Sequence, residues 1–114
     1  MEKHYIEINS MNYEIRFVPP LDNQLNFGKL AGTCDYINKV IYISNDLEKR
    51  MFKVFVHELT HAYIYEYSQK NYDDKETWTD EDLCVFMENY GIQIIRQADL
   101  NFDNLIQLKE RKIV

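Results

Sequence analysis

The chain has 114 residues, 46% of them hydrophobic and 14% aromatic, a composition typical of a folded protein with one core. Its formal net charge is −6 at pH 7, from 13 basic and 19 acidic residues. Because phosphate binding needs clustered Lys and Arg, this charge excludes nucleic acid as the main partner, and the composition excludes a disordered chain. We therefore expect one domain over residues 1–114.

The sequence also predicts a compartment. The two cysteines, Cys34 and Cys84, are too few for a disulfide framework, so we expect two free thiols in a reducing environment. The N-terminal stretch MEKHYIEINS lacks the apolar segment of a signal peptide. No apolar run approaches the roughly 20 residues of a membrane span. We therefore predict a soluble, cytoplasmic protein that does not bind membranes.

Alternation of polar and apolar residues predicts a sheet in the first third of the chain. Strands are expected over residues 5–8 and, more clearly, over residues 13–18. Pro19 and Pro20 end the second strand, because proline cannot donate a hydrogen bond to a ladder. A polar loop at residues 21–29 follows.

A hairpin and then a helix are predicted next. Two β-rich runs, residues 30–37 and 40–44, flank a polar Asn-Lys pair, which is typical of a tight turn between strands. Asp46 and its neighbours offer N-cap side chains, and Glu48 follows in the first turn. These signals predict a helix over residues 46–68.

The remainder of the chain is predicted to be helical after a charged loop at residues 69–77. Thr79 is a suitable N-cap for a second helix that continues to about residue 98, and Gly91 weakens this helix without ending it. Residues 102–112 are expected to form a short last helix. Strands followed by helices indicate an α+β fold, with a small N-terminal antiparallel sheet of three to four strands packed on two main helices.

Residues 54–65, VFVHELTHAYIY, place three ionisable side chains in an apolar stretch of the first helix. Burial of unpaired charge is costly, so these groups need a partner. Residues four apart lie one above the other on a helix, so His57 and His61 present two imidazoles to one point. Both ring nitrogens can then come within about 2.0–2.1 Å of one Zn²⁺, and Glu58 can reach a group bound there.

A surface helix with two histidines and a salt-bridging glutamate is the competing interpretation of these residues. Such a helix would show a clear polar face, whereas residues 54–65 are apolar on nearly every side. A helix that binds a metal therefore explains the stretch better.

A zinc site that keeps a place for water needs a third protein ligand. Glu81 and Glu88 are seven residues apart and share a helix face. Acidic residues at the head of that helix also have a simpler explanation, because they interact favourably with the helix dipole. The candidate ligands are His4, Cys34, Cys84, Asp80, Glu81, Asp82 and Glu88.

The motif His-Glu-Leu-Thr-His, followed by a loop and by Glu81 on the next helix, resembles the gluzincin arrangement of zinc metallopeptidases. In that family the two motif histidines and a downstream glutamate bind zinc, and the glutamate often falls about twenty residues past the second histidine, as Glu81 does past His61. The small size looks like the minigluzincins, and the helix-loop-helix looks like the phage and mobile-element peptidases of the ImmA/IrrE group. The resemblance implies a zincin-like core and zinc ligands His57, His61 and Glu81, with Glu88 and Asp82 as alternatives.

The activity that this resemblance implies is that of a zinc metalloendopeptidase. Zinc would activate water and polarise the scissile carbonyl, while Glu58 acts as the general base. The donor that stabilises the tetrahedral intermediate is expected from Tyr90, Tyr42 or His4.

The expected partner is a protein or peptide substrate, bound as an added strand beside the helix that carries the motif. Cys34, Asp35 and Tyr36 are expected to line that cleft. The alternative function is a zinc-containing, non-catalytic regulatory or protein-binding module, whose site would be closed by four protein ligands. A metal-free interaction domain is a third hypothesis. No feature of the sequence predicts an oligomeric state.

Overall fold

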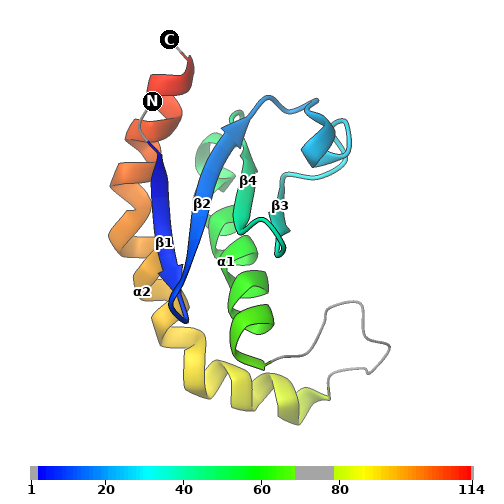
Figure 1. Cartoon of the computed structure of the whole chain (residues 1–114), viewed down its shortest axis with the longest axis vertical. Coiled ribbons are helices and arrows are strands. Elements are labelled where there is room, and N and C mark those ends of the chain that lie inside the picture. The colour runs from blue at the N-terminus through cyan, green and yellow to red at the C-terminus, as the bar shows by residue number, and fades with distance from the viewer. Residues whose placement is uncertain (1–2, 69–78, 114) are drawn as a thin grey trace.

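The computed structural model describes residues 3–68 and 79–113, and Figure 1 shows their arrangement. The elements, including two short 3-10 turns, are β1 (His4–Ile8), β2 (Met11–Val18), η1 (Asn23–Leu25), β3 (Gly32–Asp35), β4 (Val40–Ser44), η2 (Glu48–Arg50), α1 (Met51–Ser68) and α2 (Asp80–Ile113). Strands precede helices, and the expected α+β class is confirmed. The predicted loop at residues 69–77 lies outside the described residues.

The sheet has the strand order β1-β2-β4-β3, so β4 is internal and β3 forms an edge. The β1–β2 and β3–β4 pairs are antiparallel as expected, but β2 and β4 run parallel, which makes the sheet mixed. After β2 the chain passes through η1 and forms β3 at the edge of the sheet. The hairpin then places β4 between β2 and β3. This path puts the edge strand β3 next to α1 (Figure 1).

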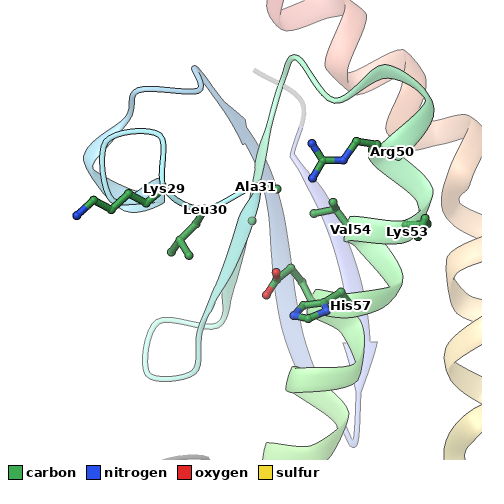
Figure 2. Close-up of a pocket in the computed structure, with 9 residues that line it drawn as sticks. Lys29, Leu30, Ala31, Arg50, Lys53, Val54 and His57 are labelled. Atoms are coloured by element: carbon green, nitrogen blue, oxygen red, sulfur yellow. The ribbon is translucent and has the colours of Figure 1, made fainter.

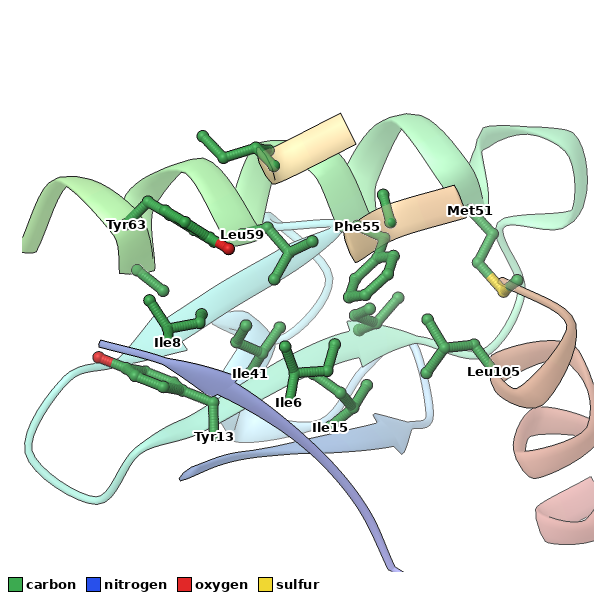
Figure 3. Close-up of a cluster of buried hydrophobic side chains, with 14 of the residues drawn as sticks. Ile6, Ile8, Tyr13, Ile15, Ile41, Met51, Phe55, Leu59, Tyr63 and Leu105 are labelled. Carbon is green, nitrogen blue, oxygen red and sulfur yellow. The ribbon is translucent and has the colours of Figure 1, made fainter. Parts of the chain in front are cut away.

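Both helices cover the same face of the sheet. Alternate residues of the strands, such as Ile15 and Ile41, meet Phe55 and Leu59 of α1, and Leu105 of α2 joins the same cluster (Figure 3). Phe55, Leu59, Ile41 and Leu105 are each 0% exposed. The apolar stripe of α1 is therefore fixed by the inward-facing side chains of the strands.

The nearly continuous apolar run of β4 is explained by burial on both faces. Ile41 and Ile43 belong to the helix-covered core, whereas Val40 and Tyr42 form a second small cluster with Leu25 of η1. Because successive side chains of a strand point to opposite faces, this second cluster lies on the face away from the helices.

The first helix begins later than predicted. Asp46 does not cap it, because its carboxylate accepts a hydrogen bond from the Ser44 hydroxyl at 2.5 Å. The chain instead passes through the 3-10 turn η2, and the α-helix starts at Met51.

The predicted separation of two C-terminal helices is wrong, because α2 is one helix of 34 residues. Ala98, Leu105 and Leu108 are all buried and recur at helical spacing, and no Gly or Pro interrupts the chain between them. Gly91 does not end the helix, as expected. Along its length α2 passes beneath the end of α1 and then runs beside β1 (Figure 1). Among the described residues, no helix combines the length and apolar character needed to cross a membrane.

Candidate metal centre

The helix α1 has two faces with different contents. Phe55 and Leu59 point into the core. The side of the helix toward β3 instead carries Val54 and His57, and Arg50 just before the helix lies on the same side. These three residues are spaced by four and three positions, which is helical spacing. His57 is exposed although its neighbours along the chain are largely apolar. The helical period therefore separates packing residues from the ionisable ones.

The two motif histidines meet as predicted. The Nε2 atoms of His57 and His61 lie 3.1 Å apart, and the rings are tilted by 76°. Two nitrogens that each lie about 2.0–2.1 Å from one tetrahedral zinc are about 3.3 Å apart, so the pair fits this ion. Burial, and secondarily the positive charge of a protonated His57, lower the pKa of His61. This favours the neutral imidazole that binds metals.

Glu58 is buried, with 5% of its surface exposed, against the edge strand. A Cβ added to Gly32 of β3 would come within 3.1 Å of Glu58 Oε2 and 2.9 Å of Val54 Cγ1, so the glycine permits this close approach. Burial raises the pKa of Glu58 to about 7. No hydrogen bond or ion pair with another described residue offsets that burial, which leaves a carboxyl group able to exchange a proton near neutral pH.

A pocket opens between the start of β3 and the first half of α1, beside these residues (Figure 2). Its volume is about 380 Å³, and His57 and Glu58 line one side of it. Lys29, Arg50 and Lys53 also line this pocket. These three residues were not predicted from the sequence; the one signal for them was the position of Arg50, two turns before His57 on the same helical side.

The other end of the β3–α1 boundary is aromatic. Tyr36 stacks on Tyr65 with ring centroids 4.6 Å apart, and Lys39 lies over the Tyr65 ring at 4.8 Å. Lys39 also pairs with Glu66, which accepts a hydrogen bond from the Tyr13 hydroxyl at 3.0 Å. Tyr65 was missed in the sequence, although it stands four residues after His61. These contacts fix the end of β3 against α1.

The residues expected to supply a third ligand do not join the histidine pair. Glu81, Cys84 and Glu88 are exposed side chains of α2. Asp82 accepts a hydrogen bond from the Thr79 backbone N–H at 3.0 Å, and the Thr79 hydroxyl accepts one from the Asp82 N–H at 3.1 Å. This reciprocal pair is a helix cap, which confirms the predicted role of Thr79 as the N-cap residue. The side chain of Asp80, another ligand candidate, lies outside the described residues. Among the side chains that the structure describes, no three His, Cys, Asp or Glu residues cluster closely enough to hold a metal ion.

Two other ligand candidates are engaged elsewhere. His4 Nε2 lies 2.9 Å from Asn101 Oδ1, between β1 and α2. Cys34 packs against the core, and burial, followed by the charge of Glu58, raises the pKa of its thiol to about 12. Both cysteines are free, as expected.

Two tyrosines were candidate donors of a hydrogen bond to the tetrahedral intermediate, and both pack against other side chains. Tyr42 lies in the small cluster on the face of the sheet away from the helices. Tyr90 stacks on Tyr67 with centroids 4.5 Å apart, in the contact between α1 and α2. Both tyrosines therefore serve packing.

No protein-family model, curated protein or solved structure matches this chain. The function must therefore be argued from the residues of the site.

Proposed function

We propose that this protein is a zinc-dependent metallopeptidase that hydrolyses peptide bonds. One observation carries the proposal: His57 and His61 bring two Nε2 atoms to 3.1 Å, and the residue that follows His57 is a buried carboxyl group beside an edge strand. A pair of surface histidines would explain the first feature without the second. Zinc, when bound, supplies a Lewis acid that activates water and polarises the scissile carbonyl.

The protein residues then divide the remaining work. His57 and His61 hold the metal through their neutral rings. Glu58 accepts a proton from the attacking water and delivers it to the leaving amine, a role that suits a carboxyl group with a pKa of about 7. The free edge of β3 binds the extended substrate through its backbone, as an added strand. The substrate is therefore an extended segment of a protein or peptide.

Glu81 is our proposed third ligand, from its place twenty residues after His61 and on the first turn of the next helix. Among the described residues its carboxylate does not form a group with the two histidines, so ligation requires the Glu81 side chain to come closer to them than in this structure. Asp82 is held in the helix cap, which makes it the weaker alternative.

Metal content and hydrolysis test the proposal together. The wild-type protein is expected to bind about one zinc per chain, and His61→Ala and Glu81→Ala are expected to lose it. His4→Ala is the matched control, because His4 contacts Asn101 and should leave zinc binding unchanged. If Glu81→Ala retains zinc, the third zinc ligand is Glu88, Asp82 or a cysteine instead of Glu81. A wild-type protein that binds no zinc contradicts the proposal.

Glu58→Gln separates an enzyme from a zinc-containing binding module. This variant should keep the metal and lose hydrolysis of a peptide mixture by about 10²-fold or more, because it lacks the general base. Zinc binding without peptide hydrolysis by the wild type would favour the non-catalytic module.

A further inference from the structure

The pocket beside the histidine pair carries an excess of positive charge. Lys29 from the loop before β3, Arg50 from η2 and Lys53 from α1 line it, and Glu58 is the one carboxylate among the described residues of its lining. An adjoining hollow of about 310 Å³ is lined again by Lys29 and Arg50. The chain as a whole has a charge of −6, so this concentration of cations is a local feature.

These three cations are available to a ligand. Among the described residues, none of them has a carboxylate within the 4.0 Å of an ion pair, whereas Arg16 pairs with Glu14 and Lys39 pairs with Glu66. Asp46 lines the adjoining hollow, and its carboxylate accepts a hydrogen bond from the Ser44 hydroxyl. A ligand carboxylate in the pocket would therefore gain charge-assisted hydrogen bonds without displacing an internal partner.

Arg50 is the best placed of the three. Figure 2 shows its guanidinium directed across the gap toward Ala31, over Val54, while Lys29 and Lys53 lie at the sides. A guanidinium presents a planar fork that matches a carboxylate in two parallel hydrogen bonds. Arg50 precedes His57 by seven residues, which is about two turns and roughly 10 Å along a helix axis.

The direction of β3 sets which part of a substrate reaches this pocket. Gly32, at the start of β3, contacts the first half of α1, and Tyr36, just after its end, stacks on Tyr65 in the last turns of α1. The strand therefore runs in the same direction as the helix. A peptide added antiparallel to β3, the more stable pairing, would run toward Arg50 in its C-terminal part. At about 3.3 Å per residue, the 10 Å to Arg50 correspond to about three residues.

We propose that this pocket selects substrates with an acidic residue, Asp or Glu, within the three residues that follow the cleaved bond. Arg50 binds the carboxylate, and Lys29 and Lys53 add to the local positive potential. The position relative to the cleaved bond rests on the proposed peptidase function. The preference of the pocket for an acidic peptide does not, so binding and cleavage can be tested apart.

Binding is measured first, on the zinc-loaded Glu58→Gln protein, by fluorescence anisotropy. The probes are two labelled peptides of identical sequence except that one carries Glu residues where the other carries Gln. The acidic peptide is expected to bind about tenfold more tightly or better, as one charge-assisted hydrogen-bonded contact provides. Adding Arg50→Gln should remove this difference. Arg96→Gln is the matched control, since it makes the same change of charge at an exposed site on α2 that lines neither hollow.

Cleavage is then measured on a randomised peptide mixture, with the cut positions read by mass spectrometry. Wild-type protein is expected to enrich Asp and Glu in the three positions after the cut, and Arg50→Glu to enrich Lys and Arg there instead. Equal binding of the two labelled peptides, or an unchanged preference in the Arg50 variants, would overturn the pocket assignment. Acidic preference in binding with no cleavage of any peptide would support the pocket and contradict the peptidase. Acidic preference before the cut would overturn the proposed position.

Discussion

The two faces of α1 show how one helix can serve packing and chemistry at once. Phe55 and Leu59 face the sheet and are 0% exposed. On the other face, His57 is exposed, and Glu58 is buried without an ion pair to another described residue. The core face gains stability from each contact, whereas the site face holds a buried carboxyl group that costs stability when it ionises. We therefore expect a neutral replacement of Glu58 and a truncation on the core face to change the free energy of unfolding in opposite directions.

The largest effect is expected on the core face. Leu59→Ala should lower the free energy of unfolding by about 3–5 kcal/mol, because it removes a fully buried side chain and leaves a cavity between α1 and the sheet. Urea unfolding of the metal-free protein measures this loss. A loss below about 1 kcal/mol would show that α1 does not pack on the sheet as described.

Glu58→Gln should raise the free energy of unfolding of the metal-free protein at pH 8. Burial raises the pKa of Glu58 from 4.5 to about 7, so the folded state holds a proton that the unfolded state has already released between these pH values. Its contribution to stability is fully present below pH 4.5 and is lost as the pH rises through 7. The loss is on the order of 3 kcal/mol for a shift of this size.

The difference between the Glu58→Gln and wild-type unfolding free energies isolates this titration, because other groups cancel. That difference should grow in favour of the variant from pH 4.5 to pH 8, measured by urea unfolding with a chelator present. A difference that does not change with pH would mean that Glu58 is solvated in the folded state.

Gly32→Ala probes the contact between the edge strand and the site face. The new Cβ would meet Val54 Cγ1 at 2.9 Å, and a β-branched side chain has little freedom to give way. We expect a loss of about 1–3 kcal/mol in unfolding free energy. Gly91→Ala is the matched control, since its Cβ meets the flexible end of Met87 and alanine favours a helix by about 1 kcal/mol. Equal effects of the two substitutions would contradict the close packing of β3 on α1.

Sequence patterns predicted the features that depend on local period. Alternation identified β1 and β2, two β-rich runs around a polar pair identified the β3–β4 hairpin, and the spacing of His57 and His61 correctly placed their ring nitrogens together. The prediction that the second helix ends at about residue 98 was wrong, because Ala98 and Leu105 are both buried and belong to one continuous apolar stripe of α2.

Features that depend on how the strands and helices pack together were harder to predict from the sequence. The parallel β2–β4 pair follows from the position of β3, and no local pattern encodes that position. The same placement brings Gly32 against Glu58 and Arg50 to the pocket. The role of Gly32 was therefore not visible in the sequence, and that of Arg50 was indicated only by its spacing from His57. Glu81 was predicted from its spacing along the chain; its side chain is exposed in the structure, and its role as a zinc ligand stays a prediction.

His57→Ala should have the smallest effect on the metal-free protein, within about 0.5 kcal/mol, because the residue is exposed. Zinc changes this expectation. A ligand that binds only the folded state at 100 times its dissociation constant adds about 2.7 kcal/mol, so zinc should stabilise the wild type by that amount and His57→Ala far less. Thermal unfolding with zinc and with a chelator measures both quantities. Equal stabilisation of the two proteins by zinc would place the metal elsewhere, and the site face of α1 would then lose its distinction from an ordinary exposed surface.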